Sequence, residues 1–303
     1  MSQRLLLCRP QGGLNDILCQ IEKCCQYAEA TARTVIVDTA YANSDFFRDK
    51  FSRYFYSKQR RLILSLDDQS PDIDAMQVYP ETLQGRLNSY TVYIDKKLRA
   101  FCEDATGQPI TFDFNRDHAH PLLVYHQAGG GNLSRFALLR LSLDRSLVDE
   151  LIARIQTMGG PWIGVHVRNT DYSTDYESLL QKLKQVSAKR IFLATDSLQV
   201  RERFQSELKN TTVYSFSRRL SADGKPLHEM RDTADADVWT SNCDAILDLV
   251  TLALSSRLMF QKIAPNAFGA SHSGYAMLAH NLWKSKIWLR HFISDPRIEF
   301  GLG

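Results

Sequence analysis

Residues 5–16, LLLCRPQGGLND, open the chain with a short apolar run that ends in a glycine turn. From Ile17 onward apolar residues recur at helical spacing, and residues 34–38, TVIVD, then form a β-branched run. A strand, a glycine turn, a helix and a second strand make up the βαβ unit of a parallel sheet. This opening stretch therefore predicts an α/β fold.

The second half of the chain repeats the alternation. An apolar strand predicted at residues 122–126 is followed by three glycines, and Gly159-Gly160-Pro161 ends a helix predicted around residues 147–155. Beyond that stop we predict strands at 162–167, 190–194, 212–216 and 258–260, and helices at 176–186, 200–208, 245–254 and 273–283. A polar loop is expected over 218–242, and an aromatic-rich helical patch over 46–56.

Two alternating blocks of similar size predict two Rossmann-like domains with parallel sheets that face a cleft. We expect residues 1–155 to form the N-terminal domain and residues 156–303 the C-terminal domain. A chain of 303 residues is long enough for two such domains.

The composition narrows the class of protein. A formal net charge of +3, from 37 basic and 34 acidic residues, argues against a nucleic-acid-binding protein, which would carry a clustered basic excess. The six cysteines lie mostly in apolar segments without paired CxxC motifs, so we expect reduced core thiols in a cytoplasmic protein. The start of the chain does not have the pattern of a signal peptide, and no run of roughly 18 apolar residues occurs.

The segment richest in chemistry is residues 163–177, IGVHVRNTDYSTDYE, in which a strand leads directly into a loop of ionisable residues. Ligands of open α/β sheets bind at the carboxyl ends of the strands, where this loop is expected. Arg168 can pair with a phosphate through its planar guanidinium. The alternative is an Arg–Asp ion pair that only fixes the loop.

The pattern His166-x-Arg168-x-Thr170-Asp171 resembles the first donor-binding motif of the α1,6-fucosyltransferases. That group includes the core-fucosylating enzymes and the rhizobial nodulation fucosyltransferase. The resemblance implies a GT-B fold in which residues 1–155 form the acceptor side and residues 156–303 bind the nucleotide-sugar. It also implies that Arg168 holds the β-phosphate of GDP-fucose and that His166 contacts the nucleotide.

The same resemblance implies a general base a few residues further along. Matching the threonine and the acid of the motif, with one residue deleted here, assigns this base to Asp175, and Glu177 is the next candidate.

Two further segments agree with the family in order and spacing. Residues 192–197, FLATDS, resemble the second motif, with Asp196 as its acid and Ser197 in place of a second acid. Residues 246–255 resemble the third motif, in which Asp248 would bind guanine by accepting from its ring N–H and its exocyclic amine. An acid on an apolar helix needs a partner, and the alternative is a carboxylate that reaches solvent or a lysine.

Two more segments complete the expected donor site. Residues 270–275, ASHSGY, open the last predicted helix, where hydroxyls and free backbone N–H groups favour an anion; simple N-capping is the alternative. The family resemblance implies contacts with the diphosphate here and a glycine turn that faces the donor across the cleft. The residues concerned are Ser271, His272, Ser273, Gly12, Gly13 and Asn15. The run Gly129–Gly131 is either a second lip of the site or an interdomain hinge.

The predicted function is inverting, metal-independent transfer of fucose from GDP-fucose to a glycan hydroxyl, as in surface polysaccharide biosynthesis. Another GDP-sugar such as GDP-mannose, or a catalytically inactive GDP-binding relative, are the alternatives. The DxD patterns at 72–74 and 235–237 are interpreted as chance, with no metal bound. The aromatic and basic tail at 283–292 either packs as a C-terminal helix or touches the inner face of the membrane.

Overall fold

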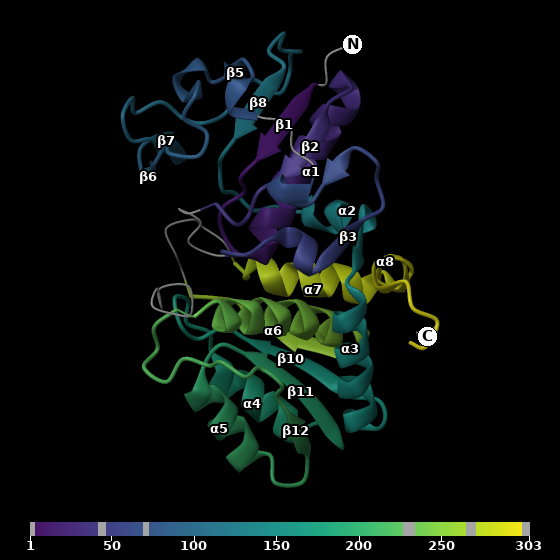
Figure 1. Ribbon diagram of the computed structural model, residues 1–303. Helices are drawn as coiled ribbons and strands as arrows, with labels where there is room; N and C mark the ends of the chain where they lie inside the picture. Colours follow the sequence, from purple (N-terminus) through teal and green to yellow (C-terminus); the bar gives the residue numbers. More distant parts are fainter. Residues whose placement is uncertain (1–3, 42–46, 69–72, 227–233, 265–270, 299–303) are drawn as a thin grey trace. The chain divides into compact units, whose positions relative to one another are not determined.

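The computed structural model describes residues 4–41, 47–68, 73–226, 234–264 and 271–298. The chain divides into two compact units, Met1–Ser142 and Leu143–Gly303, and each is an α/β unit built on a parallel sheet (Figure 1). The sequence-based boundary at residue 155 instead falls inside a helix, α3 (Arg145–Met158), which lies wholly in the second unit.

The first unit is built on a five-stranded sheet in the order β4-β2-β1-β8-β5, and all its pairings are parallel. The predicted opening unit is present, with helix α1 (Leu14–Thr31) connecting its first two strands. Every residue of the central strand is fully buried, as expected for a parallel sheet covered on both faces. The strands are β1 (Leu5–Cys8), β2 (Thr34–Val37), β4 (Leu62–Ile63), β5 (Val78–Tyr79) and β8 (Leu122–Tyr125).

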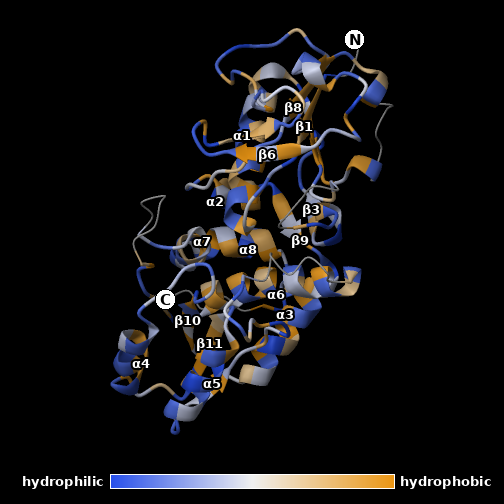
Figure 2. Ribbon diagram, turned by 90° about the vertical axis from the view of Figure 1, so that its left-hand side faces the viewer, coloured by the Kyte–Doolittle hydropathy of each residue, from blue (hydrophilic) through white to orange (hydrophobic). Residues whose placement is uncertain are grey.

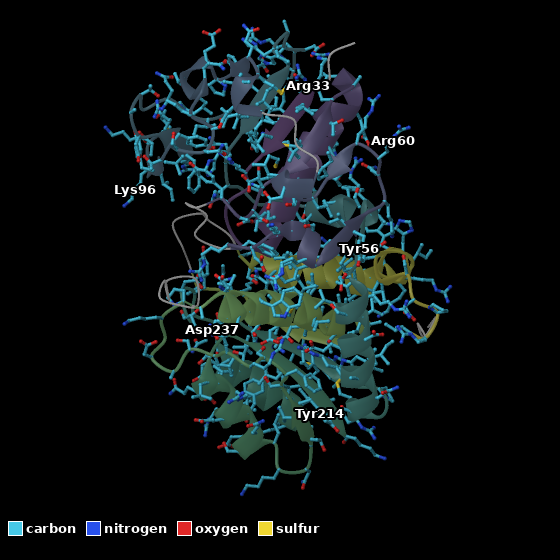
Figure 3. All side chains as sticks on the ribbon, in the orientation of Figure 1. Arg33, Tyr56, Arg60, Lys96, Tyr214 and Asp237 are labelled. Atoms are coloured by element: carbon cyan, nitrogen blue, oxygen red, sulfur yellow. The ribbon has the colours of Figure 1, made fainter. Side chains whose placement is uncertain are left out.

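Smaller elements surround this sheet. Strands β6 (Val92–Asp95) and β7 (Ala100–Glu103) pair antiparallel, and Lys96 in the turn between them points outward (Figure 3). Helix α2 (Ser134–Leu139) follows the triple glycine. Short 3₁₀ helices span Phe51–Arg53, Leu66–Asp68, Ile73–Ala75 and Glu81–Leu83.

The aromatic segment is not the helix that its spacing predicts. One 3₁₀ turn, Phe51–Arg53, leads into strand β3 (Phe55–Ser57), which pairs with β9 (Leu141–Leu143) at the boundary of the units. Phe51 and Phe55 are buried with their ring centroids 4.5 Å apart, so the aromatic residues do form core. Aromatic side chains favour strands over helices, and Phe46 lies outside the described residues.

The second unit is built on a four-stranded parallel sheet in the order β12-β11-β10-β13. Helices α4 and α5 cover one face, and α6 lies against the other (Figure 1). The strands and these helices are β10 (Ile163–Val167), β11 (Arg190–Thr195), β12 (Thr212–Tyr214), β13 (Arg257–Phe260), α4 (Tyr176–Lys184), α5 (Leu198–Glu207) and α6 (Asp235–Leu254). Two more helices, α7 (Gly274–Lys284) and α8 (Lys286–Ile293), end the described chain.

The expected loop over residues 218–242 is wrong in its last part. Helix α6 begins at Asp235, ten residues before its predicted start. Asp235 and Asp237 in its first turn stabilise this helix end through the helix dipole. This stretch looks like a loop because most of its residues are polar. It nevertheless forms an amphipathic helical turn, in which Val238 is buried.

The core has the expected chemistry. Strands β10 and β11 are hydrophobic, whereas the outer helices α4 and α5 carry many hydrophilic residues (Figure 2). All six cysteines are buried and free, which confirms the expected core thiols. In the part of the chain that the structure describes, no helix combines the length and apolar character needed to cross a bilayer.

Candidate functional site

Three loops of the second unit meet at the carboxyl edge of its sheet. Strand β10 pairs in parallel with both β11 and β13, so the residues after these strands emerge together. The loop after β13 is tied to the loop after β10 by a bridge between Thr174 and Ile263. The backbone N–H of Ile263 in turn donates to the carbonyl of Ser271, at 3.1 Å. Residues from three predicted motifs therefore lie along one edge.

Arg168 follows β10 and is held by Asp171 in a bidentate ion pair. Its Nε and Nη2 donate to the two carboxylate oxygens, each at 2.6 Å. Burial opposes the charge of Arg168, but the hydrogen bonds and charge of Asp171 raise its pKa overall. The side chain remains 30% exposed, so a phosphate can reach the guanidinium by taking the place of the carboxylate. The structure thus contains the Arg–Asp ion pair given above as the alternative to phosphate binding, and this pair is accessible to solvent.

Asp196 follows β11 and fixes the Arg168 loop. Its carboxylate accepts from the backbone N–H of Asn169, at 2.8 Å, and from the hydroxyl of Thr170, at 2.7 Å. Burial raises the pKa of Asp196 despite these hydrogen bonds. Ser197, which replaces the second acid of the motif, caps α5 by accepting from the backbone of Val200. In this structure Asp196 is a positioning residue for the loop.

The two candidate bases lie at the start of α4. Asp175 is the N-cap residue, and its carboxylate accepts from the backbone N–H of Ser178, at 3.0 Å, and from the Ser178 hydroxyl. These hydrogen bonds lower the pKa of Asp175, which makes it a weaker base. Glu177 accepts from Arg203 Nε, at 3.1 Å. Both carboxylates are accessible, and the choice between them stays a prediction.

His166 and the start of α7 lie on the same side of the sheet. The His166 ring packs on Tyr275, with centroids 5.2 Å apart, and burial together with Arg168 lowers its pKa to about 3. Ser273 caps α7 by accepting from the backbone N–H of Ala276. This is the N-capping role given above as the alternative to anion binding. Ser271 contacts His272 Nδ1 at 3.0 Å. A neutral imidazole and a helix N-terminus thus adjoin the Arg168 loop.

Asp248 is neither solvated nor paired with a lysine. Its Oδ1 accepts from Arg154 of α3, at 2.8 Å, and its Oδ2 from the hydroxyl of Ser217, at 2.6 Å. Its side chain is only 6% exposed, and burial raises its pKa to about 6 although Arg154 opposes this. Guanine would have to take the place of at least the Ser217 hydroxyl to reach this carboxylate.

The partners of Asp248 belong to a buried network that the sequence analysis did not identify. Arg154 also donates to Asp244, at 3.2 Å, one helical turn before Asp248 on α6. Asp244 in turn accepts from Arg218 through its backbone N–H and its side chain. The i,i+4 spacing of the two aspartates is a signal in the sequence, but nothing in the sequence identifies the arginine that they share.

The glycine turn lies in the first unit, beside the triple glycine. A Cβ on Gly12 would approach Asp16 to within 2.8 Å, and one on Gly130 would approach it to 2.6 Å, so both turns pack around the start of α1. Asn15 accepts from Ser134 at 2.7 Å, which links the two turns further. Gly13 is the N-cap of α1. The triple glycine therefore packs against this turn within the first unit, and its role as a lip of the site or as a hinge stays a prediction.

Several other expectations can be located. Asp72 lies outside the described residues, and Asp237, labelled in Figure 3, pairs with Arg219 at 2.9 Å. Within the described part of the chain, no group of three or more His, Cys, Asp and Glu residues could hold a metal. The tail packs on α6, because Trp283 donates to the carbonyl of Ser255 and Lys286 to that of Ala253.

Solved structures with a similar fold exist. The chain matches the NodZ alpha-1,6-fucosyltransferase co-crystallized with GDP with a TM-score of 0.58 and 18% sequence identity, over 93% of each chain. It matches the fucosyltransferase NodZ from Bradyrhizobium with the same TM-score and identity, over 93% of this chain and 94% of that one. The chain therefore has a GT-B fold, similar to that of these solved fucosyltransferases.

The expected fold class is thereby confirmed. POFUT1 in complex with GDP also matches, with a TM-score of 0.53 and 11% identity, over 93% of this chain and 96% of that one. No protein-family model matches the sequence, and neither does a curated protein. At these identities the similarity shows the fold alone. The chemistry has to be argued from the residues of this chain.

Proposed function

We propose that this protein is an inverting glycosyltransferase that moves fucose from GDP-fucose to a hydroxyl of a glycan acceptor. The observation that carries the proposal is the accessible Arg168 at the carboxyl edge of a parallel sheet, beside the N-terminus of α7, in a chain with the fold of the GT-B fucosyltransferases. A guanidinium and helix N–H groups stabilise the charge that grows on a departing diphosphate.

The reaction would be a single displacement. The acceptor oxygen attacks the anomeric carbon, its bond to the β-phosphate oxygen of GDP breaks, and the hydroxyl proton passes to Asp175 or Glu177. Arg168 exchanges Asp171 for the β-phosphate, and Asp248 exchanges Ser217 for the guanine donors. We propose that no metal ion or cofactor takes part, since cationic and N–H groups of the chain take the metal's role.

The setting of the reaction is proposed on similar grounds. Six buried, free thiols fit a cytoplasmic enzyme that assembles glycan for the cell surface. Ile287 on α8 is 77% exposed and is the best-placed apolar side chain of the tail for peripheral contact with the inner membrane face. Binding to anionic vesicles that is lost in Ile287→Asp would support this contact, and unchanged binding would contradict it.

Thermal unfolding without added metal tests the donor. We expect GDP and GDP-fucose to raise the melting temperature, while UDP and ADP leave it unchanged. A ligand at about 100 times its Kd adds ~2.7 kcal/mol to the free energy of unfolding. A shift with UDP, or one that needs manganese, would contradict the proposal. An equal shift with GDP-mannose would favour another GDP-sugar, and binding of GDP-fucose without turnover would favour the inactive relative.

Substitution of Arg168 tests the site itself. Arg168→Ala should lower kcat roughly 100-fold or more, because it removes charge stabilisation in the transition state. Its free energy of unfolding should fall by at most about 1 kcal/mol, because the ion pair is partly exposed. Arg297→Ala, which removes a half-exposed guanidinium paired with Asp149 and Asp295 in the same unit, is the control. An active Arg168→Ala enzyme would refute the assignment.

A further inference from the structure

The first unit contains a cavity that none of the predicted site residues lines. It has a volume of about 360 Å³ and lies beyond the carboxyl ends of β1 and β2, next to the 3₁₀ helix Leu66–Asp68. Ligands of open α/β sheets bind at this edge, and the volume lies within the range of small-molecule sites. The lining includes Arg9, Asp38, Lys50, Asp67 and Asn88.

The charges of the lining cancel in pairs. Arg9 Nε donates to Asp38 Oδ2 at 2.8 Å, in a pair that is almost fully buried. Lys50 pairs with Asp67 at the exposed rim. A diphosphate or carboxylate needs an excess of positive charge or unengaged donors. The paired lining has no excess of positive charge and therefore favours a neutral ligand over an anion.

The cavity offers a ligand both acceptors and donors, the donors including the Lys50 ammonium and the Ser65 hydroxyl. Two nitrogens of the Arg9 guanidinium are engaged, because Nε donates to Asp38 and Nη1 donates to the carbonyl of Leu87 at 2.6 Å, while the guanidinium covers the Tyr41 ring at 3.9 Å. Among the described residues, Asp38 Oδ1 and Asn88 Oδ1 accept no hydrogen bond, since Asp38 uses Oδ2 and Asn88 donates through Nδ2 to Asp74. Sugar hydroxyls are neutral groups that both donate and accept, so they can serve these acceptors as well as the donors beside them.

We propose that this cavity binds a neutral sugar ring of the acceptor glycan, with vicinal hydroxyls donating to Asp38 and Asn88. The assignment to the acceptor rests on the proposed transferase function, whereas the preference for a neutral polyol rests on the lining alone. It assigns acceptor recognition to the segment around residues 38–41 and 88, for which no sequence motif gave a role.

The test measures the binding of neutral methyl glycosides to the full chain by saturation-transfer NMR and calorimetry. The probes are the methyl glycosides of mannose, galactose, fucose and N-acetylglucosamine, with inorganic pyrophosphate, GDP and methyl glucosaminide as charged comparisons. Ala40 lines the cavity and is exposed, so Ala40→Phe fills the space without touching either ion pair. Ala30→Phe, at an exposed position on α1, is the matched control.

We expect at least one neutral glycoside to bind and its Kd to rise roughly tenfold or more in Ala40→Phe, but not in Ala30→Phe. Asn88→Leu keeps a side chain of similar size but removes the amide acceptor, so it should also raise the Kd of the same glycoside. The Kd for GDP should not change in any of these variants. Absence of glycoside binding, or equal binding by Ala40→Phe, would overturn the proposal.

Two outcomes separate this inference from the proposed function. Glycoside binding that depends on Ala40 in a chain that binds no GDP would support the cavity and refute the transferase. Conversely, loss of pyrophosphate, GDP or glucosaminide binding in Ala40→Phe would show a site for charged ligands, and the inference would fail even if the enzyme transfers fucose.

Discussion

At the scale of single residues, the proposed function would make the two interpretations of the Arg168 and Asp248 motifs successive states, without and with the donor. Arg168 is engaged by Asp171, and Asp248 by Arg154 and Ser217, so the unliganded chain satisfies its charges internally. A ligand must replace these partners, and part of its binding energy is spent on the exchange. Affinity therefore depends on the partner residues as much as on the motif residues.

Asp175 offers a clean test of the catalytic base. Asparagine is as good an N-cap as aspartate, so Asp175→Asn should keep α4 and the free energy of unfolding intact. If Asp175 takes the proton, kcat falls roughly 100-fold or more. Steady-state kinetics of this variant and of Glu177→Gln assign the role, because a loss confined to Glu177→Gln would transfer it to that residue.

Asp248 should make stability depend on pH in an unusual direction. Its pKa of about 6 lies above the ordinary value of 3.8, because burial disfavours its charge. The folded state therefore holds the proton more tightly, and this contribution to stability is complete below about pH 4 and lost as the pH rises through 6.

Denaturant unfolding of the wild type and of Asp248→Asn measures this contribution. Between pH 4 and 7 the stability of the wild type relative to the variant should fall by up to ~3 kcal/mol. Carboxylates with lowered pKa values, such as Asp175, act in the opposite direction but are common to both proteins. A difference that does not change with pH would show that Asp248 stays ionised.

At the scale of elements, α3 and α6 are joined by one buried guanidinium. Arg154 is 3% exposed and reaches Asp244 and Asp248 on the neighbouring helix. Arg154→Met should cost about 3–5 kcal/mol, since it leaves a buried carboxylate without its cation. Arg297→Met, which removes a half-exposed cation paired with Asp149 and Asp295, should cost much less. Denaturant unfolding measures both, and a small loss in Arg154→Met would mean that solvent reaches Asp248.

A second substitution separates charge from packing at this site. In the Arg154→Met background, Asp248→Asn should recover part of the lost stability, because it removes the unpaired charge. If Asp248→Asn recovers no stability in this background, the stability lost in Arg154→Met comes from packing around α3 instead.

Elements with a strong apolar period could be predicted from the sequence, and those whose packing overrides local preference could not. The run Leu5–Cys8, the glycine stop at Gly159 and the strand Ile163–Val167 appear where their patterns predict them. The start of α6 and the strand Phe55–Ser57 do not. Asp237 of α6 pairs with Arg219, and the strand Phe55–Ser57 pairs with Leu141–Leu143, contacts that local sequence preference does not reveal. The loop around Arg168 could likewise be predicted, but the partnership of Arg154 with α6 could not, since it joins residues about 90 positions apart.

At the scale of the whole molecule, the division between Ser142 and Leu143 can be tested by cutting the chain. Residues 143–303 contain α3 and should fold and bind GDP with a Kd within roughly tenfold of the full chain. Residues 156–303 lack Arg154 and should not fold, because Asp248 loses its cation. Circular dichroism and calorimetry report both results. If the 143–303 fragment folds but binds GDP weakly, we would infer that the turn at Gly12 and Gly13 contributes to donor binding.

The buried thiols allow the two units to be observed separately. Five of the six cysteines belong to Met1–Ser142, and Cys243 alone belongs to Leu143–Gly303. Only a solvated thiolate reacts with iodoacetamide, and burial raises the pKa of Cys25 to about 12. Alkylation thus records each transient opening as a permanent mass tag. Peptide mass spectrometry then yields an opening rate for each half of the native protein, with no engineered probe and without denaturant.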